Sequence, residues 1–404
     1  MEKRYLTILP FLITANLLGE EDFLLSPEKQ HYYEQQQQQI GAGYEKLYYD
    51  WLSPINLKGS DTYEKSASLG MHDSRQSLSA GIAQDIFRSG GIMYSIGYAD
   101  AKKNADTIGM QKEIAGIRQE LAVAVLTYQK NILLLEQSEL KLKNAQIEIF
   151  LKRKQYEAGD IDITLLNNAL MNQSSELKNN TSIRFTLAQQ RLEASKLSNQ
   201  PIESIQLPTF TLSKKENFLD EEWDIRYAYA QSQSSAQQYG QIKSSYLPKL
   251  TLIADAGHQR YNAQELSSAD YHGNFYDFGL QLSMPLTYNA SAATQEAQSI
   301  YLKQQALVAD TKRQMEGIYE QSVAKIESYT RVISITHDNL KFYDELINAT
   351  QAAVKAGYKA GYDLQTLKNT KSIEELEIKI NEVNIQTELS SLHYKMRQSQ
   401  ENPL

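Results

Sequence analysis

The chain has 404 residues, a formal net charge of -8 and no cysteine. The acidic balance argues against nucleic acid as a partner. The absence of cysteine excludes disulfides, thiolate chemistry and an acylated N-terminal cysteine as a membrane anchor. With only 19 glycines and 8 prolines, the composition is typical of long polar helices.

The first residues have the layout of a secretory signal. Two basic residues, Lys3 and Arg4, precede an uncharged stretch from Tyr5 to Leu18. This stretch is shorter than the roughly 20 apolar residues that a membrane-spanning helix needs. A buried helix of the mature protein is the alternative interpretation. The sequence therefore predicts a signal peptide over residues 1–19 and an exported mature chain.

The rest of the chain follows one plan twice, at a spacing of roughly 200 residues. Residues 78–86 read LSAGIAQDI, and residues 278–286 read FGLQLSMPL with apolar residues at the same parity. Farther along, a Tyr-x-Ala-Gly motif occurs at residues 156–159 and again at residues 358–361. We therefore expect a first repeat over residues 20–199, a linker over residues 200–217 and a second repeat over residues 218–404.

Each repeat contains two segments that alternate as the strands of a two-faced sheet do. In the clearest one, apolar residues occupy every second position from Tyr276 to Leu286. The predicted strands cover about residues 52–64, 68–87, 248–261 and 274–288. Each is long enough for a transmembrane β-strand of about 9 to 11 residues, and aromatic residues such as Trp51 and Tyr271 flank them. The alternative interpretation is a sheet of a water-soluble protein with one face exposed to solvent.

Strands that lie in a membrane must form a closed barrel, because every backbone polar group has to be paired there. Four strands cannot close a barrel, since the smallest outer-membrane barrels have about eight strands. We therefore expect several copies of the chain to pool their strands.

Long helical patterns follow each pair of strands. Apolar residues recur at seven-residue steps from Ile114 to Ile149 and again from Tyr319 to Val354, which is the spacing of a coiled coil. Helical hairpins are expected over about residues 102–198 and 292–398, and shorter helices over residues 27–48 and 219–245. The first long helix would run roughly 80 Å at 1.5 Å per residue. An ordinary dimeric coiled coil would explain the heptads, but not the strands beside them.

The chain must reverse direction at the tip of each hairpin. Gly159 and Gly361 can adopt the positive φ that ends a helix. Either Asp160 or Asp162 can cap the helix that follows the first tip, and Asp363 can cap the helix that follows the second. We therefore predict one turn at each of these two glycines.

This order of helix, two strands, long helix, glycine-containing tip and return helix, given twice, resembles the TolC family of outer-membrane efflux proteins. The resemblance is carried by residues 246–250 (YLPKL), residues 279–286 (GLQLSMPL) and the two Tyr-x-Ala-Gly tips. It implies a mainly α fold with a membrane β-barrel part. In that fold a homotrimer forms a twelve-stranded barrel, continued by a periplasmic α-barrel of twelve helices.

The resemblance also implies a function. Such a protein is a passive exit channel in the bacterial outer membrane with a periplasmic extension. It is surrounded by outer-membrane lipid and serves a tripartite efflux or type I secretion system. A periplasmic adaptor protein meets the tips and connects the channel to an inner-membrane pump. The exported substrate, whether drug, metal or protein, stays open because the pump selects it.

The tips carry the candidate site residues. Adaptor docking is predicted at Tyr156, Ala158, Gly159, Tyr358, Ala360 and Gly361, although the turns alone would require the glycines. Asp162 and Asp363 are predicted to form a constriction of the pore, with helix capping as the alternative. The second tip departs from the family pattern in being about two residues shorter before its Leu. Leu165 and Leu367 stand where the family often has an acidic residue.

No pattern indicates catalysis, a cofactor or a metal site. A phosphate-binding loop, a nucleophile elbow and a dinucleotide fingerprint are all missing. The 6 histidines lack metal-ligand spacing, and only His258 and His272 could meet across a hairpin. We therefore expect a channel rather than an enzyme. A periplasmic adaptor or a structural coiled-coil protein is the alternative.

Overall fold

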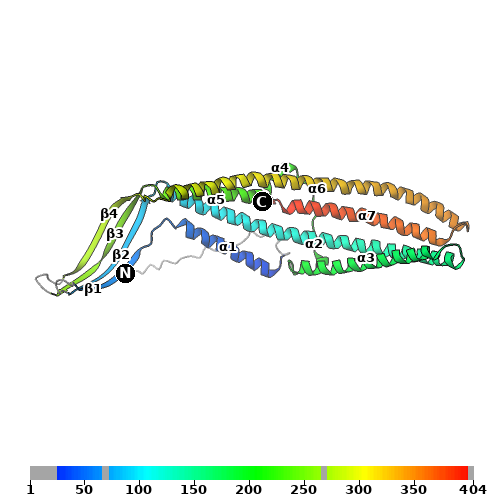
Figure 1. Ribbon diagram of the computed structural model, residues 1–404, viewed down its shortest axis with the longest axis horizontal. Helices are drawn as coiled ribbons and strands as arrows, with labels where there is room; N and C mark the ends of the chain where they lie inside the picture. Colours follow the sequence, from blue (N-terminus) through cyan, green and yellow to red (C-terminus); the bar gives the residue numbers. More distant parts are fainter. Residues whose placement is uncertain (1–24, 66–71, 265–270, 399–404) are drawn as a thin grey trace, which may run out of the picture. The chain divides into compact units, whose positions relative to one another are not determined.

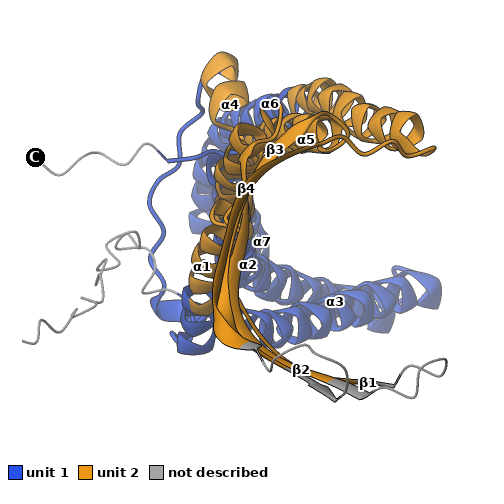
Figure 2. Cartoon of the chain, turned by 90° about the vertical axis from the view of Figure 1, so that its left-hand side faces the viewer, with its two compact units in different colours: residues 1–34, 114–214, 318–404 blue, residues 35–113, 215–317 orange. Residues whose placement is uncertain are grey.

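The computed structural model describes residues 25–65, 72–264 and 271–398 (Figure 1). The predicted signal peptide, residues 1–19, and the start of the second predicted strand, residues 68–71, lie outside these ranges. The chain divides into two compact units (Figure 2). The helical unit comprises residues 1–34, 114–214 and 318–404, and the sheet unit comprises residues 35–113 and 215–317.

The same succession of elements occurs twice along the chain. The first succession is α1 (Pro27–Tyr48), β1 (Asn56–Lys65), β2 (His72–Phe87), α2 (Gly91–Glu157) and α3 (Ile163–Ser195). A short 3₁₀-helix, η2 (Ile202–Ser204), and α4 (Lys215–Glu221) come next. The second succession is α5 (Trp223–Ser245), β3 (Lys249–Gln264), β4 (Tyr271–Ser283), α6 (Ala290–Lys355) and α7 (Gly361–Tyr394). The fold is therefore mainly helical with a small sheet, as expected.

Local chemistry explains where several elements begin. The hydroxyl of Ser26 accepts a hydrogen bond of 3.4 Å from the backbone N–H of Lys29, and Pro27 occupies the first position of α1. Both residue types are favoured at these places. The helix predicted over residues 219–245 is interrupted at Glu222, whose carboxylate accepts a hydrogen bond of 2.8 Å from the backbone N–H of Ile225 and caps α5. Two helices, α4 and α5, therefore stand where one was predicted.

Two other bounds differ from the sequence prediction. Helix α2 begins at Gly91 rather than near residue 102, because Ser89 and Gly90 take positive φ values of 48° and 85° and turn the chain directly from β2 into the helix. Strand β4 ends at Ser283 rather than at residue 288. Pro285 follows, and proline has no N–H to donate to a sheet ladder.

None of the helices in the described ranges combines the length and the apolar character needed to cross a membrane.

The sheet unit contains a 4-stranded antiparallel sheet in the order β1-β2-β3-β4 (Figure 1). The pairing runs from Asn56↔Gly81 to Lys65↔His72 between β1 and β2, from His72↔Gln264 to Phe87↔Leu250 between β2 and β3, and from Lys249↔Ser283 to Tyr261↔Tyr271 between β3 and β4. Because neighbouring residues on a strand point to opposite faces, residues in register form rows across one face.

The sheet unit is completed by α4, α5 and parts of three longer helices, namely residues 35–48 of α1, 91–113 of α2 and 290–317 of α6. The contact between α2 and α5 depends on glycine. A Cβ atom at Gly240 would lie 2.4 Å from the ring of Tyr94, so the ring of α2 occupies the space that a side chain on α5 would need. Tyr239 of α5 stacks on Tyr301 of α6 with ring centroids 6.5 Å apart. These contacts fix α5 between α2 and α6.

In the helical unit, α2 lies between α3 and α7. One apolar cluster joins Leu121, Val125 and Tyr128 of α2 to Ile183 and Leu187 of α3. Polar contacts join α2 to α7, since Asn369 Nδ2 lies 2.8 Å from Asn144 Oδ1 and Gln137 Nε2 lies 3.1 Å from Glu377 Oε2. The heptad residues of α2 thus form an apolar seam toward α3. Toward α7, these hydrogen bonds are joined by an apolar cluster that includes Ala122, Leu126 and Leu389.

The segment between the two successions packs on this unit. Ile202 and Ile205 belong to the same apolar cluster as Tyr128. The hydroxyl of Tyr128 donates a hydrogen bond of 2.9 Å to Glu203, whose carboxylate also accepts one of 2.6 Å from Arg191. The Arg191 hydrogen bond lowers the pKa of Glu203 below its ordinary value. These contacts hold the linker against α2 and α3.

Candidate functional surfaces

One face of the sheet is apolar even though it is exposed. The exposed fractions are 87% for Tyr276, 74% for Phe278 and 73% for Leu282 on β4, 80% for Leu57 on β1 and 67% for Leu78 on β2. The register Leu57↔Ala80, Ala80↔Ala256 and Ala256↔Tyr276 places them on the same side. The alternation predicted from the sequence is confirmed. We call this side the outward face.

This outward face leaves large apolar side chains exposed in the single chain. Each Å² of apolar surface left in water costs about 25 cal/mol relative to its burial, and water-soluble monomers seldom expose a contiguous apolar patch of this kind. Strands β1 and β4 are each paired on one side only within the described residues. They carry unpaired backbone groups at both edges of the sheet. The sheet therefore combines two open edges with one exposed apolar face.

The opposite face of the sheet is polar and ends in an ion pair at the junction with α2. The hydroxyls of Ser60 and Ser77 lie 2.8 Å apart across β1 and β2. The buried carboxylate of Asp85 accepts hydrogen bonds from Arg88 Nε at 2.6 Å and from the hydroxyl of Thr251. Lys249 Nζ is 3.4 Å away. These contacts hold the corner at which the sheet ends and the helix begins.

The tip between α2 and α3, called tip one, closes as predicted. Gly159 has a φ of 81°. Its N–H donates to the carbonyl of Tyr156 at 3.0 Å, and the N–H of Asp160 donates to the carbonyl of Gln155 at 2.9 Å, the hydrogen-bond pair of a Schellman motif. Asp162 is the N-cap of α3 and accepts hydrogen bonds from the N–H of Thr164, at 2.8 Å, and from its hydroxyl. The capping alternative for Asp162 is thus confirmed.

The tip between α6 and α7, called tip two, turns at a different glycine from the one predicted. Gly357 has a φ of 78°, its N–H donates to Val354 O at 3.0 Å, and the N–H of Tyr358 donates to Ala353 O at 2.9 Å. Gly361 is instead the first residue of α7. The prediction that Gly361 ends the preceding helix is wrong. The cause is a tandem repeat, because KAGY occurs at residues 355–358 and again at residues 359–362.

This turn changes how the two tips correspond. Residues 158–162 separate α2 from α3, and residues 356–360 separate α6 from α7, so tip two is not shorter than tip one. The N-cap of α7 is Ala360, which makes no side-chain hydrogen bond. Asp363 lies within the first turn of α7 and is not its cap, which corrects the second capping prediction. It occupies the place that Leu165 occupies in tip one, so an acidic residue does stand there in tip two.

All the predicted docking residues are exposed, namely Tyr156, Ala158, Gly159, Tyr358, Ala360 and Gly361. The exposed fraction of Tyr358 is 86%. Tyr362, one KAGY unit later, packs its ring 5.1 Å from that of Phe150 on α2. The sequence prediction missed Ala356 and Gly357, although they repeat the Ala158-Gly159 pair of tip one.

The two predicted constriction residues have different surroundings. Asp162 is committed to its own helix, and the hydrogen bond from Thr164 lowers its pKa below the ordinary value. Asp363 lines an open groove between α2, α3 and α7 together with Lys359, Glu148 and Glu176. Asp363 is thus the one of the pair whose carboxylate is not used for capping.

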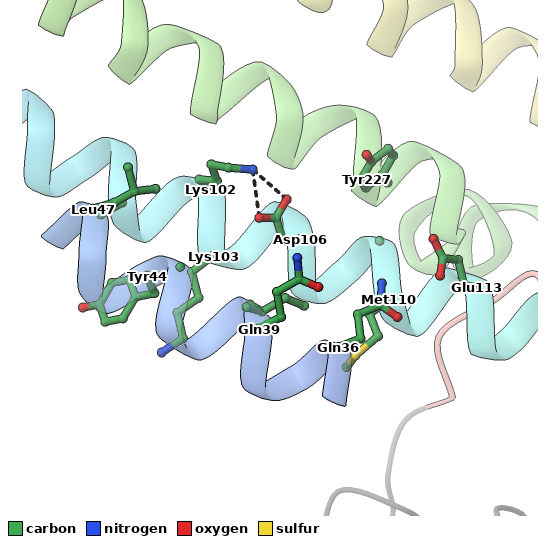
Figure 3. A pocket seen from close by; sticks show the side chains of 14 residues that line it. Gln36, Gln39, Tyr44, Leu47, Lys102, Lys103, Asp106, Met110, Glu113 and Tyr227 are labelled. Carbon is green, nitrogen blue, oxygen red and sulfur yellow. Dashed lines mark hydrogen bonds and ion pairs between the residues drawn. The ribbon is translucent and has the colours of Figure 1, made fainter. Parts of the chain in front are cut away.

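A second groove, in the sheet unit, was not indicated by any sequence pattern (Figure 3). It has a volume of about 410 Å³ and lies between α1 and α2, with Tyr227 of α5 at its side. Lys102 Nζ is 2.9 Å from Asp106, a hydrogen bond that raises the pKa of the lysine. Lys103 Nζ lies 4.3 Å from the ring centroid of Tyr44. Both lysines that line this groove therefore already interact with other residues that line it.

Within the described ranges, no three or more His, Asp or Glu side chains are grouped so that they could hold a metal ion. His258 and His272 lie on the outward face, one register step apart, because the pairs are His258↔Asn274 and Arg260↔His272. His258 Nδ1 is 2.9 Å from Asn274 Oδ1. The two histidines are therefore diagonal neighbours on adjacent strands and are not paired directly across the hairpin.

Residues 216–387 match the family model described as outer membrane efflux protein. No curated protein sequence matches the chain significantly. Among solved structures, the outer membrane protein VceC from Vibrio cholerae has 17% identity and a TM-score of 0.71 over 91% of this chain and 92% of its own. The CmeC outer membrane channel of Campylobacter jejuni has 10% identity and a TM-score of 0.70 over 93% of this chain and 85% of its own.

The open state of the Neisseria gonorrhoeae MtrE outer membrane channel gives 16% identity and a TM-score of 0.65, over 90% of this chain and 85% of that one. These identities are low, so the likeness to solved structures concerns the fold. The family match covers the second succession of elements. The family match over residues 216–387 and the shared fold both agree with the resemblance to outer-membrane efflux proteins of the TolC family seen in the sequence.

Proposed function

We propose that the protein is the outer-membrane exit channel of a tripartite efflux or type I secretion system. It is a passive conduit from the periplasm to the outside, and an inner-membrane pump supplies the energy. The sheet lies in the bacterial outer membrane, and the helical hairpins extend into the periplasm. The observation that carries this proposal is the exposed apolar outward face on a sheet whose two edge strands are unpaired.

Three copies of the chain would complete the sheet. Four strands from each copy give a barrel of twelve, within the range known for outer-membrane barrels, and β1 of one copy would pair with β4 of the next. The helical unit supports the same pooling. Its outer helices α3 and α6 expose large apolar side chains, among them Phe185, Leu192, Ile335 and Phe342. In water these side chains would favour contact with another copy.

Two tests address the channel itself. The full-length chain should fractionate with outer membranes, and the detergent-purified oligomer should be a trimer with discrete conductance in a planar bilayer. A water-soluble monomer or dimer without conductance would contradict the proposal and favour a periplasmic adaptor or a structural coiled-coil protein.

Adaptor docking at the tips is a second part of the proposal. The exposed turns at Gly159 and Gly357 and the exposed ring of Tyr358 support it. We expect Tyr358→Ala, which leaves both glycine turns in place, to reduce cross-linking to the adaptor and export together. Normal cross-linking in this variant, with unchanged export, would refute docking through Tyr358.

A pore constriction at Asp363 is the third part. Three copies of Asp363 around a common axis would concentrate negative potential in a narrow passage. We expect Asp363→Asn to weaken block of the conductance by multivalent cations. Asp162→Asn is the matched control, because Asn keeps the capping role and Asp162 is already committed to α3. Equal effects of the two changes would exclude a special role for Asp363.

A further inference from the structure

The outward face changes character along its strands. The row formed by Leu57, Ala80, Ala256 and Tyr276 is entirely apolar or aromatic, as are the rows nearer the helices at Phe278 and Leu282. The row between those two holds Gln84 beside Leu252 and Leu280. One register step farther from the helices, the row is Gly59, Leu78, His258 and Asn274. The next step gives Asp61, Gln76, Arg260 and His272. A polar band therefore replaces the apolar one on the same face.

Resting on the proposed membrane function, we infer that this polar band binds the phosphate group of an outer-leaflet lipid headgroup, with Arg260 as its central residue. The helices of an exit channel face the periplasm, so the rows away from the helices meet the outer leaflet. Tyr276 stands at the edge of the apolar rows, where barrels carry aromatic side chains at the membrane interface. Arg260 then lies at the depth of the headgroups.

A hollow on this part of the sheet provides room for the ligand. Its lining includes Gly59, Asp61, Gln76, Leu78, His258 and Arg260. Gly59 keeps the hollow open, because a Cβ atom there would meet only Leu78 Cδ1, at 3.9 Å, and a larger side chain would extend into the free space. The hollow borders the apolar rows, so a lipid whose acyl chains cover those rows can place its headgroup in it.

The charges in the band are complementary to a phosphate. Arg260 has no acidic partner among the described residues, and a guanidinium can donate two parallel hydrogen bonds to a phosphate. His272 is in register with it, and the ring N–H of a neutral imidazole is a further donor. The nearby acid, Asp61, accepts a hydrogen bond of 3.3 Å from Gln76. It lies two strands away, about 10 Å from the Arg260 backbone.

The sheet contains its own control for this charge. Arg75 is one residue from Gln76 on β2, so it lies on the opposite face, where its guanidinium carbon is 5.7 Å from the ring centroid of Tyr261. Removing Arg75 changes the net charge by the same amount as removing Arg260. It takes the charge from the face that would line the pore instead of the face that would meet lipid.

The test measures lipid binding to the purified full-length oligomer by native mass spectrometry. The probes are diphosphoryl lipid A, the same lipid without its phosphates, and inorganic phosphate. Arg260→Gln should weaken binding of the phosphorylated lipid about tenfold, and Arg75→Gln should leave it unchanged. Gly59→Leu, which fills the hollow without changing charge, should weaken it as well.

Several results would overturn the inference. One is equal affinity for the lipid with and without its phosphates. A second is an equal loss of lipid affinity in Arg260→Gln and Arg75→Gln. A third is inorganic phosphate binding as tightly as the lipid, which would indicate a site for a soluble anion. Conductance is recorded on the same preparations. Conducting oligomers without phosphate-dependent lipid binding refute only the lipid site, whereas preparations that neither form trimers nor conduct refute the proposed channel.

Discussion

The two hairpin tips have the same backbone turn but different helix caps. In tip one the turn at Gly159 is followed by Asp162, whose side chain caps α3. In tip two the turn at Gly357 is followed by Ala360, which makes no side-chain cap, and by Gly361, the first residue of α7. The geometry that both tips require is therefore the positive φ of one glycine. The cap is an addition that tip one has and tip two lacks.

The largest expected effect comes from replacing the glycine that turns the chain. Gly357→Ala should destabilise tip two by about 1–2 kcal/mol, because an L-residue pays this much for the left-handed conformation. The space around Gly357 is open, so no steric clash adds to the cost. Amide hydrogen exchange of residues 353–363 should accelerate roughly tenfold, which corresponds to about 1.4 kcal/mol.

Gly361→Ala is the matched control, four residues away in the identical KAGY unit. Here the φ is not positive, and alanine forms helices better than glycine. The variant should slow exchange in the same peptide, with a gain of about 0.4–1 kcal/mol. A loss in Gly361→Ala as large as that in Gly357→Ala would place the turn at the second glycine after all.

The misplaced turn illustrates a limit of sequence reasoning. In both KAGY units a glycine follows alanine and precedes tyrosine, so local propensity cannot choose between them. The choice depends on packing, since Tyr362 reaches Phe150 and Asn369 pairs with Asn144 on α2. These contacts set where α7 begins, and they lie between segments more than 200 residues apart in the chain.

Other elements were predictable because their signals are local. The predicted bounds of α1 coincide with the observed Pro27–Tyr48, where a serine and a proline mark the start. The apolar alternation of β4 gave the correct outward face. The start of α2 could not be predicted in the same way, because Ser89 takes a positive φ that its residue type does not favour. The seven-residue pattern alone located only the later part of that helix.

A smaller effect is expected from giving tip two the cap it lacks. Ala360→Ser adds a hydroxyl at the N-cap of α7, where it can accept a hydrogen bond from the backbone of the first turn. The gain should be about 1 kcal/mol, typical of a serine in place of alanine at an N-cap. Exchange of the amides at residues 362 and 363 reports it directly. Lys359→Ser places the same residue one position earlier and should give no such protection.

The smallest effect concerns pH and should appear at tip one only. The hydrogen bond from Thr164 lowers the pKa of Asp162 below its ordinary value of 3.8, so its ionised form stabilises the folded tip. That stabilisation is fully present above the ordinary pKa and is lost as pH falls through the lower folded value. Glu157 acts in the same direction, because its hydrogen bond with Lys154 lowers its pKa too.

Asp162→Asn separates the two groups. Asparagine caps about as well as aspartate, so exchange at residues 163–165 should be nearly unchanged at neutral pH. In acid, the wild-type tip should lose protection after correction for intrinsic exchange, whereas the variant should lose only the part that belongs to Glu157. Tip two has alanine at the equivalent cap position and should show no capping contribution to titrate. Identical acid profiles for the wild type and Asp162→Asn would mean that the cap charge adds nothing, and that the glycine turn alone sets the stability of both tips.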